Sequence, residues 1–148
     1  MILEETTEVK ASPGDVYRFF ESMEENYPRW HPDHVTFLWI DGESLKAGEK
    51  AYFEETIAGK RQRKTVRFTR VESDRYIEFE PTSLLIGLLV PHISFTIVPR
   101  PDGCEITQRI KVRTGPIGAW LNRGEFDAVR KHMREEGENL KRIFEERE

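Results

Sequence analysis

The 148-residue sequence lacks the marks of several large classes of protein. It contains a single cysteine, Cys104, which excludes an intrachain disulfide framework and a cysteine-rich zinc site. Its longest apolar run, residues 84–90, is far shorter than the ~20 residues of a transmembrane helix. Its formal net charge of −4 argues against a general nucleic-acid binder. We therefore expect neither a membrane span nor a nucleic-acid partner.

The composition that remains is typical of a globular protein. Hydrophobic residues make up 37% of the chain and charged residues 34%, which suits a single domain with one core over residues 1–148. The first three residues are apolar, but Glu4 and Glu5 follow at once, which is not the pattern of a secretory signal peptide. Together with the lone cysteine, this pattern predicts a cytoplasmic protein.

Apolar periodicity and turn residues predict the order of the elements. A strand over residues 2–10 precedes a helix that begins at Pro13, with Ser12 as its N-cap, and a short helix over residues 23–30. Further strands are expected over residues 35–40, 51–57, 65–71, 76–80, 93–98 and 105–113. Sequential hairpins favour an antiparallel sheet, and a long C-terminal helix supplies the second layer. The sequence therefore predicts an α+β fold.

Residues 126–148 have the period of an amphipathic helix that packs on a core. Glu136 lies near the middle of its apolar stripe, and His132, one turn earlier, lies at the edge. Side chains four residues apart point the same way, so both face whatever the helix covers. A carboxylate facing a core is costly unless it is paired, protonated or bound to a metal. The pattern fits either a His–Glu pair at the helix rim or two metal ligands.

The strand over residues 51–57 places another carboxylate on an apolar face. Glu55 shares its face with Phe53 and Ile57, because side chains alternate along a strand. Glu55 is therefore expected to point inward. A register shifted by one residue would turn Glu54 inward instead.

The other histidines lie beside expected strands. His31 and His34 form a His-x-x-His pair just before the second strand, a spacing that can chelate a metal but also occurs by chance in exposed loops. His92 begins a later strand, where the alternation sets it opposite its apolar neighbours Ile93 and Phe95. It either reaches the interior or lies on the surface at the strand end.

The segments ASPGDVYRFF (residues 11–20) and AGEKAYFEETIAGK (residues 47–60), with the element order, resemble the START-like helix-grip superfamily. This superfamily, also called SRPBCC, includes the birch-pollen allergen and polyketide cyclases. The resemblance covers nearly the whole chain. It implies a curved antiparallel sheet wrapped around the long C-terminal helix, with an internal cavity that holds a hydrophobic small molecule.

Histidine nitrogens and carboxylate oxygens beside such a cavity suit zinc or another divalent transition metal. Without cysteine in the set, the site would be catalytic in type, with a position left for water. Such a metal lowers the pKa of its water to about 7 and polarises a carbonyl.

A narrower resemblance points to one chemistry. The order WHPDH (residues 30–34), strand glutamate, histidine and helical His-x-x-x-Glu is similar to the zinc-dependent diacetylphloroglucinol hydrolases, which cleave a carbon–carbon bond in an acylated polyphenol. The resemblance implies four metal ligands, namely His34, Glu55, His132 and Glu136. This chain is shorter than those enzymes, so loops that shape their substrate pocket are expected to be missing.

Two alternatives stay open within that ligand set. Either His31 or His34 is the loop ligand. We favour His34 because it adjoins the strand, which leaves His31 in the catalytic site as a residue that supports the ligands or contacts the substrate. Glu54 is the alternative to Glu55. The resemblance also implies that His92 is the acid–base residue of the catalytic site.

Two classes of function follow. The first is a zinc-dependent hydrolase of a carbonyl-bearing, aromatic or polyketide-like molecule, and the second is a non-catalytic carrier of a hydrophobic ligand or lipid. The chain is expected to be a monomer or a homodimer. Residues 84–90 are expected to line or cover the cavity, with an exposed dimer or membrane contact as the alternative. The basic run at residues 60–64 is interpreted as the solvated flank of a hairpin.

Overall fold

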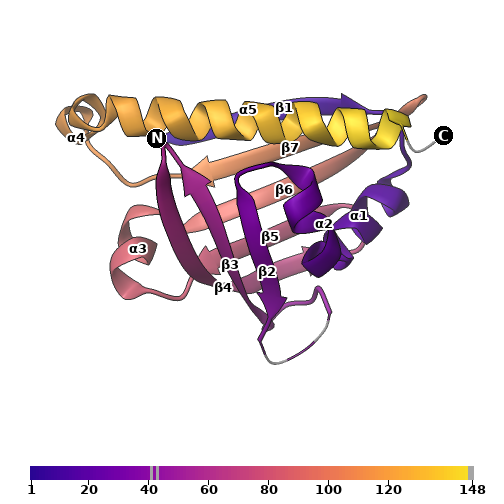
Figure 1. The fold of residues 1–148 in the computed structure, drawn as a ribbon, viewed down its shortest axis with the longest axis horizontal. Coiled ribbons are helices and arrows are strands. Elements are labelled where there is room, and N and C mark those ends of the chain that lie inside the picture. Colours follow the sequence, from indigo (N-terminus) through magenta and orange to yellow (C-terminus); the bar gives the residue numbers. More distant parts are fainter. Residues whose placement is uncertain (41, 43, 147–148) are drawn as a thin grey trace.

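The computed structural model describes residues 1–40, 42 and 44–146. Within them, a seven-stranded antiparallel sheet curves as a half-barrel around a long C-terminal helix (Figure 1). The strands are β1 (Ile2–Val9), β2 (His34–Trp39), β3 (Lys50–Ile57), β4 (Lys60–Glu72), β5 (Tyr76–Pro81), β6 (His92–Arg100) and β7 (Gly103–Lys111). The helices are α1 (Pro13–Glu21), α2 (Met23–Trp30), α3 (Leu84–Leu89), α4 (Pro116–Leu121) and α5 (Arg123–Glu146).

The strand order is β1-β7-β6-β5-β4-β3-β2, and every neighbouring pair is antiparallel. Strands β2 to β7 follow one another as in the chain, and β1 joins the far edge beside β7. Helix α5 lies along β1, and α2 packs against β2 and contacts α5, with α1 beside it (Figure 1). This arrangement confirms the expected α+β helix-grip fold.

Local sequence explains where the elements begin and how closely they pack. The Ser12 hydroxyl accepts the Asp15 backbone N–H at 3.1 Å, so the predicted cap starts α1. Gly137 lets α5 approach β1, because a Cβ at this position would lie 2.2 Å from the Thr7 hydroxyl oxygen. The last helix begins at Arg123, three residues before the sequence pattern indicates, and residues 147–148 lie outside the described part of the chain.

Aromatic residues fill the core between the first two helices and the sheet. The rings of Phe20 and Trp30 lie 5.6 Å apart, and those of Phe20 and Phe95 lie 4.8 Å apart. Each fully buried side chain of this size stabilises the fold by about 1.5–3 kcal/mol. This packing closes one part of the half-barrel and leaves a cavity in the rest.

The apolar run at residues 84–90 was expected to line or cover the cavity, and only two of its residues do so. It forms α3, a short helix that contacts β5, and none of its helical residues is buried. Leu85 is 78% exposed, and only Ile86 and Val90 of this run line the cavity. A six-residue helix at the end of the sheet has too little contact with the core to bury both of its faces.

Candidate functional site

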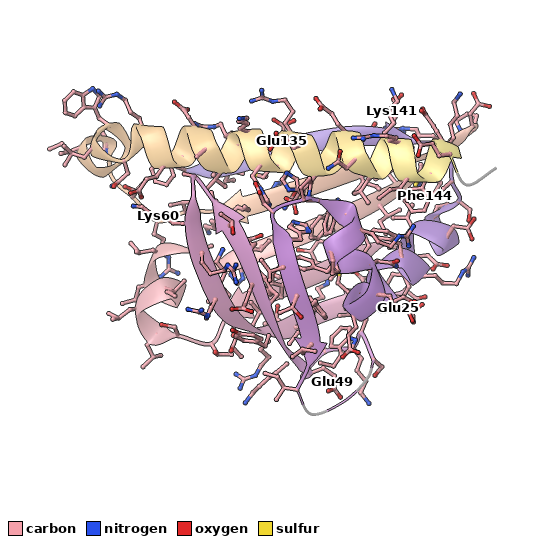
Figure 2. The ribbon with its side chains drawn as sticks, in the orientation of Figure 1. Glu25, Glu49, Lys60, Glu135, Lys141 and Phe144 are labelled. Carbon is pink, nitrogen blue, oxygen red and sulfur yellow. The ribbon has the colours of Figure 1, made fainter. Side chains whose placement is uncertain are left out.

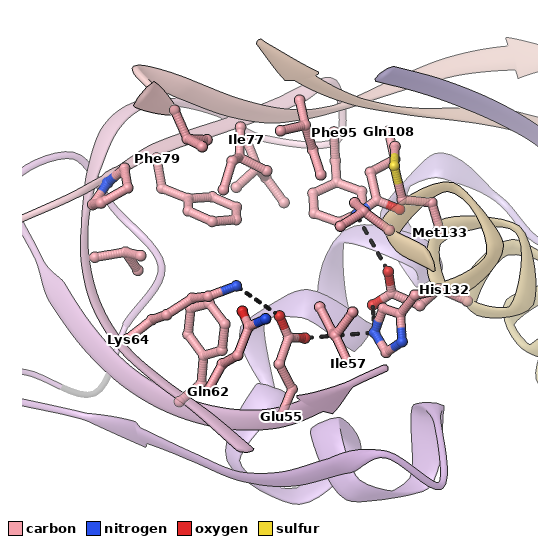
Figure 3. Close-up of a pocket in the computed structure, with 18 of the residues that line it drawn as sticks. Glu55, Ile57, Gln62, Lys64, Ile77, Phe79, Phe95, Gln108, His132 and Met133 are labelled. Carbon is pink, nitrogen blue, oxygen red and sulfur yellow. Dashed lines mark hydrogen bonds and ion pairs between the residues drawn. The ribbon is translucent and has the colours of Figure 1, made fainter. Parts of the chain in front are cut away.

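A cavity of about 400 Å³ lies between the curved sheet and α5. Its walls are mainly apolar and include Phe53 and Phe68. Figure 3 shows four more of the apolar residues that line it, namely Ile77, Phe79, Phe95 and Met133. A cavity of this size and character suits a small hydrophobic molecule. A few polar side chains interrupt the apolar wall, and they gather where β3 faces α5.

The structure brings together the four side chains that the sequence analysis singles out as metal ligands. They come from three elements: His34 begins β2, Glu55 lies on β3, and His132 and Glu136 lie one turn apart on α5. All four are buried. The i, i+4 spacing on α5 and the alternation on β3 aim these groups at one point, as the sequence pattern predicts.

The distances within this cluster are short. His34 Nε2 lies 2.9 Å from Glu136 Oε2, 3.3 Å from His132 Nε2 and 3.9 Å from Glu55 Oε2. His132 Nε2 lies 3.5 Å from Glu55 Oε2 and 3.7 Å from Glu136 Oε2. Two imidazole nitrogens and two carboxylate oxygens therefore surround one small volume.

The hydrogen bonds of His34 fix its tautomer. Its Nδ1–H donates to the Tyr27 carbonyl at 2.9 Å, so the lone pair of the neutral ring lies on Nε2, facing the cluster. The Tyr27 ring stacks on the imidazole at 3.9 Å and holds its plane. A backbone carbonyl that accepts from the far nitrogen is the usual support of a metal-binding histidine.

His31 is also buried, but its lone pair is occupied. The backbone N–H of Asp33 donates to His31 Nδ1 at 2.9 Å, which leaves Nε2 as the protonated atom that donates to Glu135 at 3.2 Å. The His31 ring lies 4.4 Å from that of His132, so His31 borders the cluster. His31, His132 and Glu135 also lie close enough to share an ion, yet the hydrogen bonds favour His34 as the loop ligand.

Glu55 lies inward and Glu54 outward. Glu55 lines the cavity, whereas Glu54 pairs with Arg63 on the other face of the sheet at 2.7 Å. Burial raises the pKa of the Glu55 carboxyl, but the His132 hydrogen bond and the Lys64 ammonium at 2.9 Å outweigh it and hold that pKa well below its usual range. Glu55 is therefore an anion beside the imidazoles.

The two carboxylates also act on His132. Burial lowers the pKa of this imidazole, but the Glu55 hydrogen bond and the negative charge of Glu136 dominate, so the net shift is upward. Without a metal, His132 thus carries the proton that balances part of the buried negative charge. A divalent cation is an alternative source of that positive charge.

Two further side chains hold the carboxylates in place. The Tyr27 hydroxyl donates to Glu55 Oε2 at 3.0 Å, and burial together with the adjacent carboxylates raises the pKa of this phenol. The Gln108 amide donates to Glu136 Oε1 at 3.4 Å, an interaction that Figure 3 shows from the cavity side. Glu136 therefore keeps Oε2 directed at the histidines, while Glu55 Oε2 both faces the histidines and accepts the Tyr27 hydroxyl.

The structure corrects the expectation for His92. Its side chain is 47% exposed, and its Nδ1 lies 3.2 Å from the Glu78 carboxylate. Its neighbours Ile93 and Phe95 line the cavity, so strand alternation directs His92 to the opposite face of the sheet. An acid–base role in the cavity does not fit this position.

Sequence reasoning missed Lys64 and Gln62, which were interpreted as part of a solvated hairpin flank. Both line the cavity (Figure 3), and they share the face of β4 that carries the buried Val66 and Phe68. Extending that alternation back from Val66 would have placed both side chains inside. The strong basic character of residues 60–64 obscured this signal.

Residues 2–145 match a family model described as polyketide cyclase / dehydrase and lipid transport. The chain belongs to this family. Membership confirms the wider resemblance to the SRPBCC superfamily and gives the chain a fold that binds hydrophobic small molecules, in agreement with its apolar cavity. The narrower resemblance to zinc-dependent diacetylphloroglucinol hydrolases stays a prediction. No curated protein matches the sequence.

Solved structures share the fold of this family member at low sequence identity. The KanY protein is 13% identical with a TM-score of 0.75, over 98% of this chain and 97% of that one. Norcoclaurine synthase from Thalictrum flavum, solved with dopamine and hydroxybenzaldehyde, is 12% identical with a TM-score of 0.74, over 100% of this chain and 88% of that one. BexL, a di-domain ARO/CYC of the BE-7585A biosynthetic pathway, is 21% identical with a TM-score of 0.71, over 96% of this chain and 45% of that one.

These identities show the fold alone. A helix that combines the length and the apolar character needed to cross a bilayer does not occur among the described residues.

Proposed function

We propose that this polyketide cyclase / dehydrase family member is a zinc-dependent hydrolase that acts on a carbonyl-bearing aromatic molecule in the cavity. The observation that carries the proposal is the spacing of the four buried donor atoms of His34, Glu55, His132 and Glu136. Five of their six pairwise distances lie between 2.9 and 3.9 Å. Four ligands about 2.1 Å from a central zinc ion would be about 3.4 Å apart.

The chemistry of the donors agrees with this spacing. Imidazole nitrogen and carboxylate oxygen are ligands of zinc and related divalent metals, and the Nε2 lone pair of His34 already faces the cluster. Two carboxylates, one of them paired with Lys64, lie beside two histidines in a buried place. A divalent cation would replace the proton of His132 in balancing their negative charge. Three of the groups, His34, Glu55 and His132, offer atoms that all lie within 4.8 Å of one another.

The four side chains would hold a zinc ion, which can expand from four ligands to five. Bound there, it would supply an activated water near neutral pH in the fifth position and polarise a substrate carbonyl. The apolar walls bind the aromatic ring and keep bulk water away from the reacting carbonyl. Tyr27 and Gln108 orient the carboxylates. Lys64 holds a proton at Nζ inside the cavity, beside Glu55, so it is placed for the acid role that the resemblance implied for His92.

The reaction balances as a hydrolysis. Water adds its hydroxyl group to the acyl carbon, the bond between the acyl carbon and the ring carbon breaks, and the ring carbon takes a proton from Lys64. The products are a carboxylic acid and the deacylated phenol. A proton from the attacking water returns to Lys64 through solvent.

The test is hydrolysis of a panel of acylated polyphenols, with the free carboxylic acid measured for zinc-loaded and chelator-treated protein. The proposal expects turnover only with zinc, loss of turnover in Glu136→Gln and Lys64→Met, and near-normal turnover in His92→Ala. Turnover that persists without metal, or a zinc-loaded protein that hydrolyses none of the panel, contradicts it.

One observation favours a second candidate, a non-catalytic carrier of a hydrophobic molecule. Among the described residues, every buried side-chain nitrogen or oxygen has a hydrogen-bond partner without a metal. The polar cluster can therefore persist as a hydrogen-bonded head-group site at the wall of an apolar cavity. Tight binding of apolar ligands by zinc-free protein, unchanged on adding zinc and without turnover, favours this candidate over the hydrolase.

A further inference from the structure

Exposed apolar side chains gather at one end of the molecule, on α3 and α4. Leu85 of α3 is 78% exposed and Trp120 of α4 is 63% exposed. We call this the end surface, formed mainly by Leu84, Leu85, Leu88, Ile117, Trp120 and Leu121. Figure 1 shows both helices at the end away from the C-terminus. The Arg113 backbone N–H donates to the Leu89 carbonyl at 2.7 Å, which ties the end of α3 to the segment that precedes α4. Exposed apolar patches of this kind mark contact sites.

The cavity reaches the surface of the molecule at the same end. Ile86 of α3 lines the cavity and is 41% exposed. Val90 after α3 and Phe126 in the first turn of α5 line the cavity as well. The end surface therefore surrounds the place where a hydrophobic molecule can enter.

The stretches that carry the end surface contain basic but no acidic residues, and Glu80 and Glu125 lie just outside them. Residues 81–101, which contain α3, and residues 106–124, which contain α4, include no acidic residue, although the whole chain has 27. Lys111 and Arg113 precede α4, and Figure 2 shows Lys60 at the same end of the molecule. None of these three cations forms an ion pair with another described residue. Arg123 lies 4.5 Å over the exposed Trp120 ring.

We propose that the end surface docks on an anionic lipid membrane and exposes the mouth of the cavity to the lipid. Apolar side chains of short amphipathic segments enter the boundary between head groups and acyl chains, and surrounding lysines and arginines attract anionic head groups. Arginine and tryptophan together are typical of such an interface. A hydrophobic ligand then passes between membrane and cavity without crossing water.

Charge distinguishes a membrane from a second copy of the chain. A two-fold dimer brings the same surface of both copies together. A dimer through α3 and α4 would thus place Lys111, Arg113 and their symmetry mates in one interface, without an acidic residue in either surrounding stretch to pair with them. An anionic membrane complements both the apolar centre and the positive rim.

The experiment uses the full chain with vesicles of phosphatidylcholine and phosphatidylglycerol in equal parts, and with pure phosphatidylcholine as the neutral reference. Co-sedimentation measures binding, and a change in tryptophan emission that is lost in Trp120→Phe reports insertion of the exposed Trp120, since Trp30 is buried and Trp39 is partly buried against the core. We expect binding to the anionic vesicles that weakens with salt. Leu85→Glu is expected to weaken it at least tenfold, and Lys60→Glu about fivefold or more.

Matched variants at other exposed places control for charge and hydrophobicity alone. Leu38→Glu changes an exposed leucine on β2, and Lys141→Glu changes an exposed lysine at the other end of α5 (Figure 2). Both should bind vesicles as the unchanged chain does. Absence of binding, or equal losses in Leu38→Glu and Leu85→Glu, overturns the proposal. A dimer in solution that Leu85→Glu dissociates also overturns it, because the surface then contacts a second copy.

Discussion

Glu54 and Glu55 offer a matched test of the metal site, because they are neighbours on β3 and lie on opposite faces of the sheet. Glu55 lies within 4 Å of both cluster histidines, whereas Glu54 pairs with Arg63 outside. Replacing either by glutamine removes one negative charge and keeps the shape of the side chain. Only Glu55→Gln replaces an anionic ligand of the cluster with a neutral amide, so only this change should weaken zinc binding.

The expected magnitude follows from binding linkage. Zinc at 100 times its dissociation constant stabilises the folded chain by about 2.7 kcal/mol. For a chain of this length, that corresponds to a rise of roughly 5–11 °C in melting temperature. If Glu55→Gln weakens binding about 100-fold, at the upper end of the losses known for supporting residues, the same zinc concentration stabilises by about 0.4 kcal/mol. The rise then falls to about 1–2 °C.

Differential scanning calorimetry with and without zinc measures these shifts. Glu54→Gln should keep the full rise in melting temperature, and Glu55→Gln should lose most of it. Equal rises in the two variants would refute the inward assignment of Glu55 as a ligand. A chain whose melting temperature does not respond to zinc at all would refute the site itself.

Three further predictions concern single residues. Burial raises the pKa of the Cys104 thiol to about 11, so Cys104 should react with thiol reagents at pH 8 only on unfolding. Because the folded chain holds the thiol proton more tightly than the unfolded chain, the free energy of unfolding should fall as pH rises above about 9. Gly103→Ala should destabilise the fold by roughly 3 kcal/mol or more in urea unfolding, since φ is +153° and the new Cβ would lie 2.1 Å from the Val9 carbonyl oxygen; an unchanged midpoint would contradict this. Lys64→Met should lower the free energy of unfolding of the metal-free protein by about 1–3 kcal/mol. This loss is smaller than for a fully buried ion pair because the Lys64 side chain is 26% exposed. An unaltered stability would show that Glu55 does not need this partner.

Periodicity accounts for most of what the sequence could predict. The strands, the α1 cap and the long final helix follow local rules of alternation, capping and amphipathic spacing. The same rules place Glu55, His132 and Glu136 on inward faces, because a side chain's face depends only on its position within its own element. Its position beside the strand favoured His34 as the loop ligand, but no local rule decides between His34 and His31.

The deciding information for the histidine pair is three-dimensional. The backbone carbonyl of Tyr27 accepts a hydrogen bond from His34 Nδ1, whereas the backbone N–H of Asp33 donates one to His31 Nδ1. No rule of sequence spacing predicts that difference. Figure 3 shows Lys64 inside the cavity, although the run of basic residues around it suggested the solvent-exposed flank of a hairpin. For α3, hydrophobicity suggested burial, but burial depends on having something to pack against, which the end of the sheet does not provide.

The most direct test of the metal site is the metal content of untagged protein purified without chelator. Elemental analysis should find about one zinc ion per chain, or its uptake on adding zinc. His132→Ala should lose the metal, while His92→Ala, which changes an exposed histidine, should retain it. Protein that holds no zinc and takes up none, or that retains it fully in His132→Ala, would contradict the account.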